Sequence, residues 1–366
     1  MFHADPHSRL DQHPDHVMRI NSLLQEEHQR TGYLMISYLA GRPVAVGTIL
    51  PKIKNSKVLR AMGPAFKLKG FYLCGHRFLM ADSHSHDVTF LKSLLKSVIN
   101  FCHKSEGRFL LLGDILCDSP INQALKTISP DWFSYSYTGQ QPRSLIYFPE
   151  NPQEYWNQFR SKSRRKHRKL IRDNSHLRLV RITQPDQVED FLSAAHQISL
   201  NTWQSQYLGL RVKNSEKELE ELMFLALNDS LRSYLLMEDD QPVAFKIGHQ
   251  YKGIYHDQEF GFDLNYARIS PGETLLLLIL EDLISYAPPK IFDFGTGDAE
   301  YKQRYASDTA HSQSVILFPR TLQNKSLTWY LKSSWWLEQS LRNLLKTSGA
   351  HTAVRQLVRY RKLGSR

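Results

Sequence analysis

The chain has 366 residues, 41% of them hydrophobic, and a formal net charge of +11. This composition supplies a full core for two domains and excludes a mainly disordered chain, and no apolar run approaches the length of a transmembrane helix. Three scattered cysteines argue against a disulfide framework or a zinc site and favour the reducing cytoplasm. The positive charge indicates an anionic partner but does not choose among CoA, tRNA, lipid headgroups and acidic glycan.

The first half of the chain predicts a hairpin followed by strands and helices in alternation. Residues 33–47 are expected to form a strand, a tight turn and a second strand, with Pro43 at the start of the second strand. The elements expected after it are an apolar strand at Phe71–Met80, a helix at Val88–Lys104, a short strand at Phe109–Leu112, a helix from Pro120, and strands at Phe133–Tyr137 and Ser144–Phe148.

A basic segment, Asn151–Arg172, follows the first half. Its first residues, Asn-Pro-Gln-Glu, are typical of a helix start. Arginines 160, 164, 168 and 172 recur four residues apart and fall near one stripe, where like charges repel by roughly 0.2–0.5 kcal/mol per pair. A bound anion would offset this repulsion, so we weigh a phosphorylated or acidic ligand at Arg164 and Arg168 against a solvated linker helix.

The second half repeats the order of the first. Residues 233–248 again predict strand, turn and strand, and their Pro-Val-Ala (242–244) repeats residues 43–45. The elements expected around this hairpin are a strand at Leu177–Ile182, helices near 185 and 216 with capping boxes at Thr183/Asp186 and Ser215/Glu218, a strand at Ile254–Asp263, a helix at Gly272–Ala287, a short strand at Ile291–Phe294 and a final strand at Ser314–Phe318. We interpret the chain as two copies of one α/β unit, the first without room for the opening strand and helix.

Residues 291–306 read Ile-Phe-Asp-Phe-Gly-Thr-Gly-Asp-Ala-Glu-Tyr-Lys-Gln-Arg-Tyr-Ala. Gly295 and Gly297 allow a sharp turn and a close approach to a ligand. The acid, lysine and tyrosines after them are types that carry proton transfer and stabilise anions. The segment therefore predicts the rim of an active site.

In order and spacing, these motifs resemble the acetyltransferase family of the cellulose-biosynthesis (CelD/BcsL) type within the GNAT superfamily, which also includes the tandem-GNAT Fem aminoacyltransferases. The matching pieces are the basic helix Ser161–Arg172, the hairpin Asp240-Gln-Pro-Val-Ala, the loop Ser270-Pro-Gly-Glu-Thr, and Asp-Phe-Gly-x-Gly-Asp-x-x-Tyr-Lys at 293–302. The resemblance implies an α/β fold of two tandem GNAT-like (acyl-CoA N-acyltransferase) units with mixed central sheets and a helical extension. We expect a degenerate first unit at 1–150, a basic linker helix at 151–173, a second GNAT unit at 174–320, and a basic helical extension at 321–366.

The same resemblance implies a binding site for acyl-CoA as co-substrate. The pyrophosphate is expected at the helix start formed by Arg268, Ser270, Gly272, Glu273 and Thr274, where free N–H groups bind phosphate. The loop lacks the glycine-rich form of typical GNAT enzymes, so the alternative is that Ser270 simply caps the helix.

Acyl transfer from a thioester needs a base, donors for the oxyanion, and an acid for the leaving thiolate. Strand alternation places Asp257 and Glu259 on one face of strand 254–263, and either is our candidate base, with His256 behind them. The resemblance implies that Tyr301 or Tyr305 is the acid and that Lys302 faces the donor phosphate or the oxyanion. Asp293 and Asp298, with Gly295 and Gly297, would orient the acceptor. Surface ion pairs for the acids and a packed tyrosine are the alternatives.

The predicted function is acyl transfer from acyl-CoA to an amine or hydroxyl, with an envelope or exopolysaccharide sugar precursor as acceptor. A Fem-like transferase using aminoacyl-tRNA and a non-catalytic GNAT-fold binding protein are the alternatives. We expect no metal, because the histidines have loose spacing in a polar tail and a loop. The segment 329–346 is amphipathic, aromatic and basic, and it predicts a helix that packs on its own domain or lies at the inner face of a membrane.

Overall fold

The computed structural model describes the whole chain except residues 1–8, 29–30, 58–64, 81–83, 85, 106, 129–131, 137, 203–204, 206–210 and 348–366. Two compact units make up the chain. Unit 1 is Met1–Pro142 with Ala310–Arg366, and unit 2 is Arg143–Thr309.

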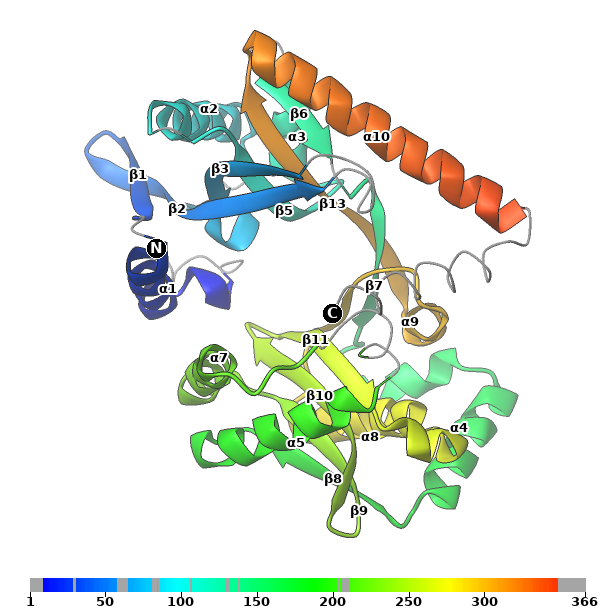
Figure 1. Cartoon of the computed structure of the whole chain (residues 1–366). Helices are drawn as coiled ribbons and strands as arrows, with labels where there is room; N and C mark the ends of the chain where they lie inside the picture. The colour runs from blue at the N-terminus through cyan, green and yellow to red at the C-terminus, as the bar shows by residue number, and fades with distance from the viewer. Residues whose placement is uncertain are drawn as a thin grey trace. The chain divides into compact units, whose positions relative to one another are not determined.

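Unit 1 is a mixed sheet with α2, α3 and α10 packed against it (Figure 1). Its elements are η1 (Leu10–Gln12), α1 (Pro14–His28), β1 (Tyr33–Leu39), β2 (Arg42–Lys57), β3 (Ala65–Leu73), η2 (Cys74–His76), β4 (Leu79–Met80), α2 (Val88–Lys104), β5 (Leu110–Leu116), α3 (Pro120–Thr127), β6 (Trp132–Ser136), β13 (Asp308–Pro319) and α10 (Leu322–Thr347). The strand order is β1-β2-β3-β5-β13, with β6 on the other side of β13 and β4 paired to β2. Apolar side chains of α2 and α3 pack with those of the sheet, so the core is continuous.

Unit 2 has the strand order β7-β12-β11-β10-β9-β8. Its elements are β7 (Gln141–Tyr147), η4 (Pro152–Gln158), α4 (Ser161–Asp173), β8 (Leu177–Ile182), η5 (Pro185–Gln187), α5 (Val188–Leu200), α7 (Glu216–Leu227), β9 (Ser233–Glu238), β10 (Gln241–Tyr251), β11 (Ile254–Phe262), η6 (Leu264–Ile269), α8 (Pro271–Tyr286), β12 (Ile291–Thr296) and α9 (Glu300–Tyr305). Nearly every leucine and isoleucine in the middle of α8 is buried in the core of unit 2, which explains the unbroken apolar run at 275–280.

The repeat predicted from the sequence is present. The series β1, β2, β3, α2, β5 in unit 1 has the same order as β9, β10, β11, α8, β12 in unit 2, and in each series the last two strands pair in parallel. In unit 1 α1 precedes the hairpin, so the expectation of no opening helix is wrong. The single strand expected at Phe71–Met80 is interrupted, because Gly75 and His76 adopt positive φ angles after β3.

The unit boundaries differ from the predicted ones because two strands pair outside the half in which they were placed. The expected final strand of the second unit, β13, lies between β5 and β6 of unit 1, and β7 pairs with β12 of unit 2. Val315–Phe318 of β13 are fully buried there. The segment 151–173 belongs to unit 2, since the Tyr155 hydroxyl donates to the Tyr305 carbonyl at 2.8 Å. An apolar strand pattern predicts that a strand is buried, but it does not identify the neighbouring strands with which it pairs.

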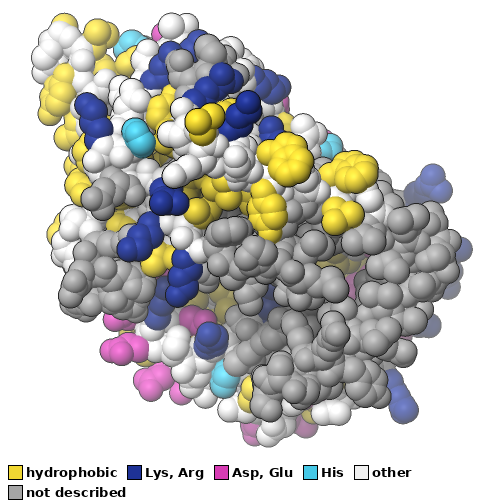
Figure 2. Space-filling model, turned by 45° about the horizontal axis from the view of Figure 1, so that its top comes forward, with side chains coloured by type: hydrophobic (Ala, Val, Ile, Leu, Met, Phe, Trp, Pro, Cys, Tyr) yellow, Lys and Arg dark blue, Asp and Glu magenta, His cyan; other side chains and the backbone are white. Residues whose placement is uncertain are grey.

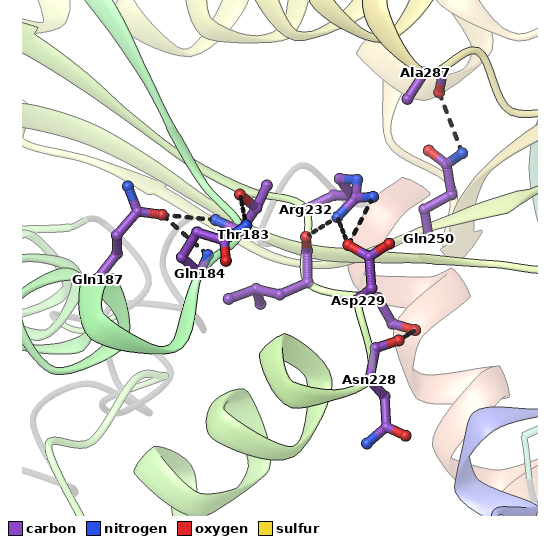
Figure 3. A network of polar contacts seen from close by, with 10 residues as sticks. Thr183, Gln184, Gln187, Asn228, Asp229, Arg232, Gln250 and Ala287 are labelled. Carbon is purple, nitrogen blue, oxygen red and sulfur yellow. Dashed lines mark hydrogen bonds and ion pairs between the residues drawn. The ribbon is translucent and has the colours of Figure 1, made fainter.

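One predicted capping box is wrong and the other is confirmed in part. The box before α5 consists of Gln184 and Gln187, with Gln187 Oε1 accepting from Thr183 N and Gln184 N at 2.9 and 3.0 Å (Figure 3). Ser215 caps α7 and accepts from the Glu218 amide, but the Glu218 carboxylate accepts from the Lys213 amide at 2.6 Å, so only the first half of the predicted box is present. After α7, Arg232 pairs with Asp229 at 3.4 Å and fixes the turn into β9 (Figure 3).

The C-terminal helix α10 packs along β6, and the Tyr135 hydroxyl donates to the Leu331 carbonyl at 3.2 Å (Figure 1). On the other side of the helix Trp329 and Trp336 are 72% and 66% exposed. Figure 2 shows hydrophobic side chains lying at the surface among Lys and Arg side chains. No helix in the described part of the chain is both long and apolar enough to span a bilayer.

Candidate functional site

The site in unit 2 begins where two parallel strands part. β11 and β12 pair at Ile254/Ile291, Tyr255/Phe292 and His256/Asp293, and then separate although β11 runs on to Phe262 and β12 to Thr296. A bulge at Gln258 lies just past this point, because Ile247 and Gly248 of β10 face Glu259 and Asp257 of β11. Bulges bend a strand and redirect side chains. Beyond His256 and Asp293, the backbone groups of β11 and β12 are therefore no longer paired with each other.

Asp293 fixes the base of this opening. Its buried carboxylate accepts from Arg143 Nε at 2.9 and 3.0 Å, and Arg143 Nη2 also donates to it. The Gly295 amide donates at 2.8 Å, and His256 Nδ1 lies 3.7 Å away. Burial opposes ionisation, but these hydrogen bonds outweigh it and hold the pKa of Asp293 far below its usual range. Asp293 thus supports the glycine turn. The sequence did not reveal Arg143, because the strand that carries it, β7, was assigned to the first half of the chain.

Lys302 projects from α9 onto the end of β12. Its ammonium donates to the carbonyl oxygens of Phe294 at 2.6 Å and Thr296 at 3.1 Å. The turn exposes these carbonyls because Gly295 and Gly297 have φ angles of 69° and 123°. Burial lowers the pKa of Lys302. An ammonium carries three donors, so one is left over from these two bonds.

A cavity of about 170 Å³ adjoins the opening. Its wall is formed by Lys246, Phe260, Phe262, Gly272, Glu273, Leu276, Tyr301, Arg304 and Tyr305. The Tyr305 hydroxyl donates to Glu273 Oε1 at 3.0 Å, and Arg304 Nη1 lies 3.1 Å from the same oxygen. Burial raises the pKa of both Tyr301 and Tyr305, so each keeps its proton at neutral pH.

The two predicted carboxylates lie near this cavity with different partners. Asp257 forms a buried ion pair with Lys246 at 2.7 Å, and Glu259 pairs with the half-exposed Arg211 at 3.0 Å. After burial, the charges of both acids are the causes that raise the pKa of Tyr301. The strand therefore brings Asp257 and Glu259 to one tyrosine, while the His256 ring stacks on His249.

The start of α8 leaves its backbone donors open. Ser270 has a φ of 52° and its side chain makes no cap, so the simple-cap alternative is wrong. Arg268 and Ser270 are exposed, whereas Thr274 is buried, donating to the Ser270 carbonyl and accepting from Asn174. A Cβ on Gly272 would lie 2.6 Å from the Phe260 ring, so this glycine permits close packing of helix on strand.

Three other predicted residues lie away from these contacts. Asp298 is exposed and accepts from Gln303. Arg164 and Arg168 line a different cavity of unit 2, between η4, α4 and α8. His167, which the sequence did not single out, lies between the two cavities. It lines the second one, and its Nε2 is 3.4 Å from the hydroxyl of Tyr305 in the first. No described group of His, Cys, Asp or Glu is arranged to hold a metal.

Comparisons with known proteins agree with this geometry. Residues 157–303 match the family described as Acetyltransferase (GNAT) domain. Among solved structures, FemX is similar with 11% identity over 81% of this chain and 90% of its own, at a TM-score of 0.55. The C-terminal domain of a putative lysylphosphatidylglycerol synthetase from Agrobacterium fabrum has 11% identity over 82% and 88%, at 0.51. A conserved protein of unknown function from Bacteroides thetaiotaomicron has 12% identity over 79% and 86%, at 0.50. No curated protein matches the chain. Unit 2 is therefore similar to GNAT acetyltransferase domains over residues 157–303, and the chain shares its mixed α/β fold with these solved structures.

Proposed function

We propose that unit 2 transfers an acyl group from acyl-CoA to the amine or hydroxyl of an envelope or exopolysaccharide sugar precursor. The observation that carries the proposal is the parting of β11 and β12 past His256 and Asp293, beside a helix start without a side-chain cap. The match of residues 157–303 to GNAT acetyltransferases supports the same chemistry.

The donor would lie across this opening. The amides of Gly272 and Glu273 at the start of α8 would receive the pyrophosphate, since helix N-termini bind anions through free N–H groups and the helix dipole. Arg268 is exposed at the same loop and adds a positive charge. The acyl group would enter the cavity beside Tyr301, where Phe260, Phe262 and Leu276 form an apolar wall.

Three groups can then perform the transfer. The acceptor nitrogen or oxygen attacks the thioester carbonyl and gives its proton to Glu259, which is partly exposed, unlike the buried Asp257. The third donor of Lys302 stabilises the oxyanion. As the carbon–sulfur bond breaks, Tyr301 protonates the thiolate. Asp257 remains paired with Lys246, and Tyr305 remains bonded to Glu273.

Replacing Lys302 tests the oxyanion assignment. We expect Lys302→Ala to lower kcat by about 10²–10³, the usual effect of removing one oxyanion donor. The dissociation constant for acyl-CoA should change little. Lys302→Arg keeps the charge and the contacts with the turn, and it serves as control. Equal losses of folding and activity in Lys302→Ala, seen by circular dichroism, would remove Lys302 from the catalytic groups.

A thermal-shift series identifies the donor. Acetyl-CoA, longer acyl-CoAs and tRNA are compared with the full chain, and a ligand at 100 times its dissociation constant stabilises the fold by roughly 2.7 kcal/mol. We expect a shift with acyl-CoA that depends little on salt. A shift only with tRNA, falling steeply with salt, supports a Fem-like aminoacyl-tRNA transferase instead. A shift with acyl-CoA but no product with any amine or hydroxyl acceptor supports a binding protein.

The exposed side of α10 supports peripheral contact with the cytoplasmic membrane face. Leu322, Lys325, Trp329, Lys332 and Trp336 are all exposed and recur at three- and four-residue spacing, which places indole rings and ammonium groups on one side of the helix. In flotation with anionic liposomes, we expect the wild type to float and Trp329→Ala with Trp336→Ala to remain in solution. Equal flotation of both would contradict the contact.

A further inference from the structure

The second cavity of unit 2 differs from the first in both charge and lining. It measures about 440 Å³ and lies between η4, α4 and α8. Arg164, His167 and Arg168 contribute nitrogen atoms from one helix, and Glu281 and Ser285 contribute oxygen atoms from α8. At about 30 Å³ per water, the volume equals roughly fifteen waters, which is room for a small polar compound.

Two buried nitrogen atoms of this wall have no partner in the described structure. They are Arg164 Nε and His167 Nδ1, and His167 as a whole is only 6% exposed. The other groups of Arg164 are only weakly engaged, since Nη1 lies 3.4 Å from Asn157 Oδ1. A buried polar atom without a hydrogen bond is destabilising, so a ligand that pairs with these atoms removes that penalty.

The hydrogen-bonding roles of the two nitrogen atoms differ. Arg164 Nε always carries a proton and needs an acceptor. The Tyr305 hydroxyl donates to Glu273, so His167 Nε2, at 3.4 Å from that hydroxyl, must be the protonated nitrogen of a neutral ring. Burial lowers the pKa of His167 and favours the neutral ring. Nδ1 is then an acceptor and needs a hydroxyl or amine donor.

The remaining groups fit a ligand with both kinds of atom. Arg164 and Arg168 form a positive wall, and burial raises the pKa of the opposing Glu281, which reduces its repulsion of an anion. Glu281 and Ser285 can exchange hydrogen bonds with hydroxyl groups. Trp156 supplies an apolar ring face that a sugar ring can cover.

We propose that this cavity binds a phosphorylated sugar, with the phosphate on Arg164 and Arg168 and ring hydroxyls on His167 and Glu281. The site is separate from the acyl-transfer cavity and needs no acyl donor. His167 connects the two cavities. Its Nδ1 would accept the sugar hydroxyl, and its Nε2 faces the Tyr305 hydroxyl of the acyl-transfer cavity. A free sugar phosphate and a sugar nucleotide share this chemistry.

Calorimetric titration of the full chain without any CoA tests the site. The probes are glucose 1-phosphate, UDP-glucose, inorganic phosphate and glucose. We expect saturable binding of a phosphorylated sugar at least ten-fold tighter than of phosphate or glucose alone. The relative affinity of glucose 1-phosphate and UDP-glucose then identifies the source. No saturation with either phosphorylated sugar, or equal affinity for inorganic phosphate, overturns the proposal.

Neighbouring arginines of α4 provide the matched control. Arg164→Gln removes the inward guanidinium, and Arg165→Gln removes the same charge from the exposed side of the same helix. We expect Arg164→Gln to weaken binding at least ten-fold and Arg165→Gln by less than two-fold, with both melting as the wild type does. Equal weakening would reduce the effect to general electrostatics and contradict a built site. Because the titration contains no donor, its outcome does not depend on whether unit 2 transfers acyl groups.

Discussion

Helices α2 and α8 occupy the same place in the two units, yet their first turns differ. Asp87 caps α2, and its carboxylate accepts from the amides of Thr89 at 2.9 Å and Phe90 at 3.0 Å. Ser270 precedes α8 in a left-handed conformation and caps nothing. A carboxylate already occupies the donors of α2, so that helix start has little to offer a phosphate, whereas α8 keeps its amides free.

The openings between the two parallel strands also differ between unit 1 and unit 2. In unit 1, β3 and β5 part after Tyr72/Leu111, and the ring of His76 enters there, with Nδ1 accepting from the Gly113 amide at 2.9 Å. In unit 2 the opening receives Lys302, an ammonium with a donor to spare. The same opening thus holds the neutral imidazole ring of His76 in unit 1 and the Lys302 ammonium, which can take part in a reaction, in unit 2. The difference supports the proposed donor site in unit 2, while unit 1 has a cavity of about 350 Å³ beside His76.

The buried Arg143–Asp293 pair gives the largest expected effect. Unit 1 has leucines at the corresponding part of β5 (Leu110–Leu112). Arg143→Ala leaves a buried charge unpaired, and we expect a loss of about 3–5 kcal/mol in unfolding free energy. Urea unfolding measures it. Arg181→Ala, which breaks the more exposed pair with Asp282, is the control and should cost less.

A double replacement sharpens this result. Arg143→Met with Asp293→Leu replaces the ion pair by two apolar side chains, and it should recover part of the lost stability because no charge is left unpaired. A double variant less stable than Arg143→Ala would show that the pair stabilises the fold through more than charge compensation.

The ring of His76 predicts acid sensitivity. Burial, with the charges of Arg9 and Lys52 against Asp114, lowers the pKa of His76 from 6.5 to about 4. The unfolded chain then binds more protons between these values, so stability is full above about pH 6.5 and falls as the pH drops toward 4. From pH 7 to pH 5 we expect a loss of roughly 2 kcal/mol from this group.

The variant His76→Asn removes the titrating ring while keeping an acceptor in a residue that tolerates positive φ. Urea unfolding at pH 7 and pH 5 should show a smaller pH dependence in this variant. The remaining pH dependence would come in part from His16 and His249, whose pKa values burial also lowers. An unchanged pH dependence would mean that His76 is not held neutral in the opening.

The cap of α2 gives the smallest effect. Asp87→Ala should cost about 1 kcal/mol of unfolding free energy, the usual loss for an N-cap. Acyl-CoA affinity, measured by calorimetry, should be unchanged because the proposed donor site lies at α8. A tighter or an additional acyl-CoA site in this variant would show that α2 competes for the ligand once Asp87 is gone.

Local patterns in the sequence were sufficient for most elements and for part of the site. The Pro-Val-Ala repeat and the Ser270-Pro-Gly loop placed the hairpins and the start of α8, since turn and helix-start residues act through their immediate neighbours. The glycine turn and Lys302 were found for the same reason, lying within a few residues of each other.

Pairing over long distances could not be predicted in this way. Arg143 meets Asp293 across 150 positions, and β13 joins strands that precede it by almost 200 positions. His167 carried no signal, because a histidine within a basic run reads as part of that run until Tyr305 packs against it. The bulge at Gln258 was likewise not predicted, because strand alternation assumes a regular register.

The most direct measurement is a calorimetric titration of the full chain with acetyl-CoA, comparing wild type, Ser270→Asp and Ser270→Asn. We predict one site per chain, because Asp87 occupies the first-turn amides of α2, the counterpart of α8 in unit 1. Ser270→Asp places a negative charge beside the pyrophosphate and should weaken binding at least ten-fold, about 1.4 kcal/mol, whereas the neutral Ser270→Asn should stay within two-fold. Two sites per chain, or equal affinities of the two variants, would contradict the assignment of the donor to α8.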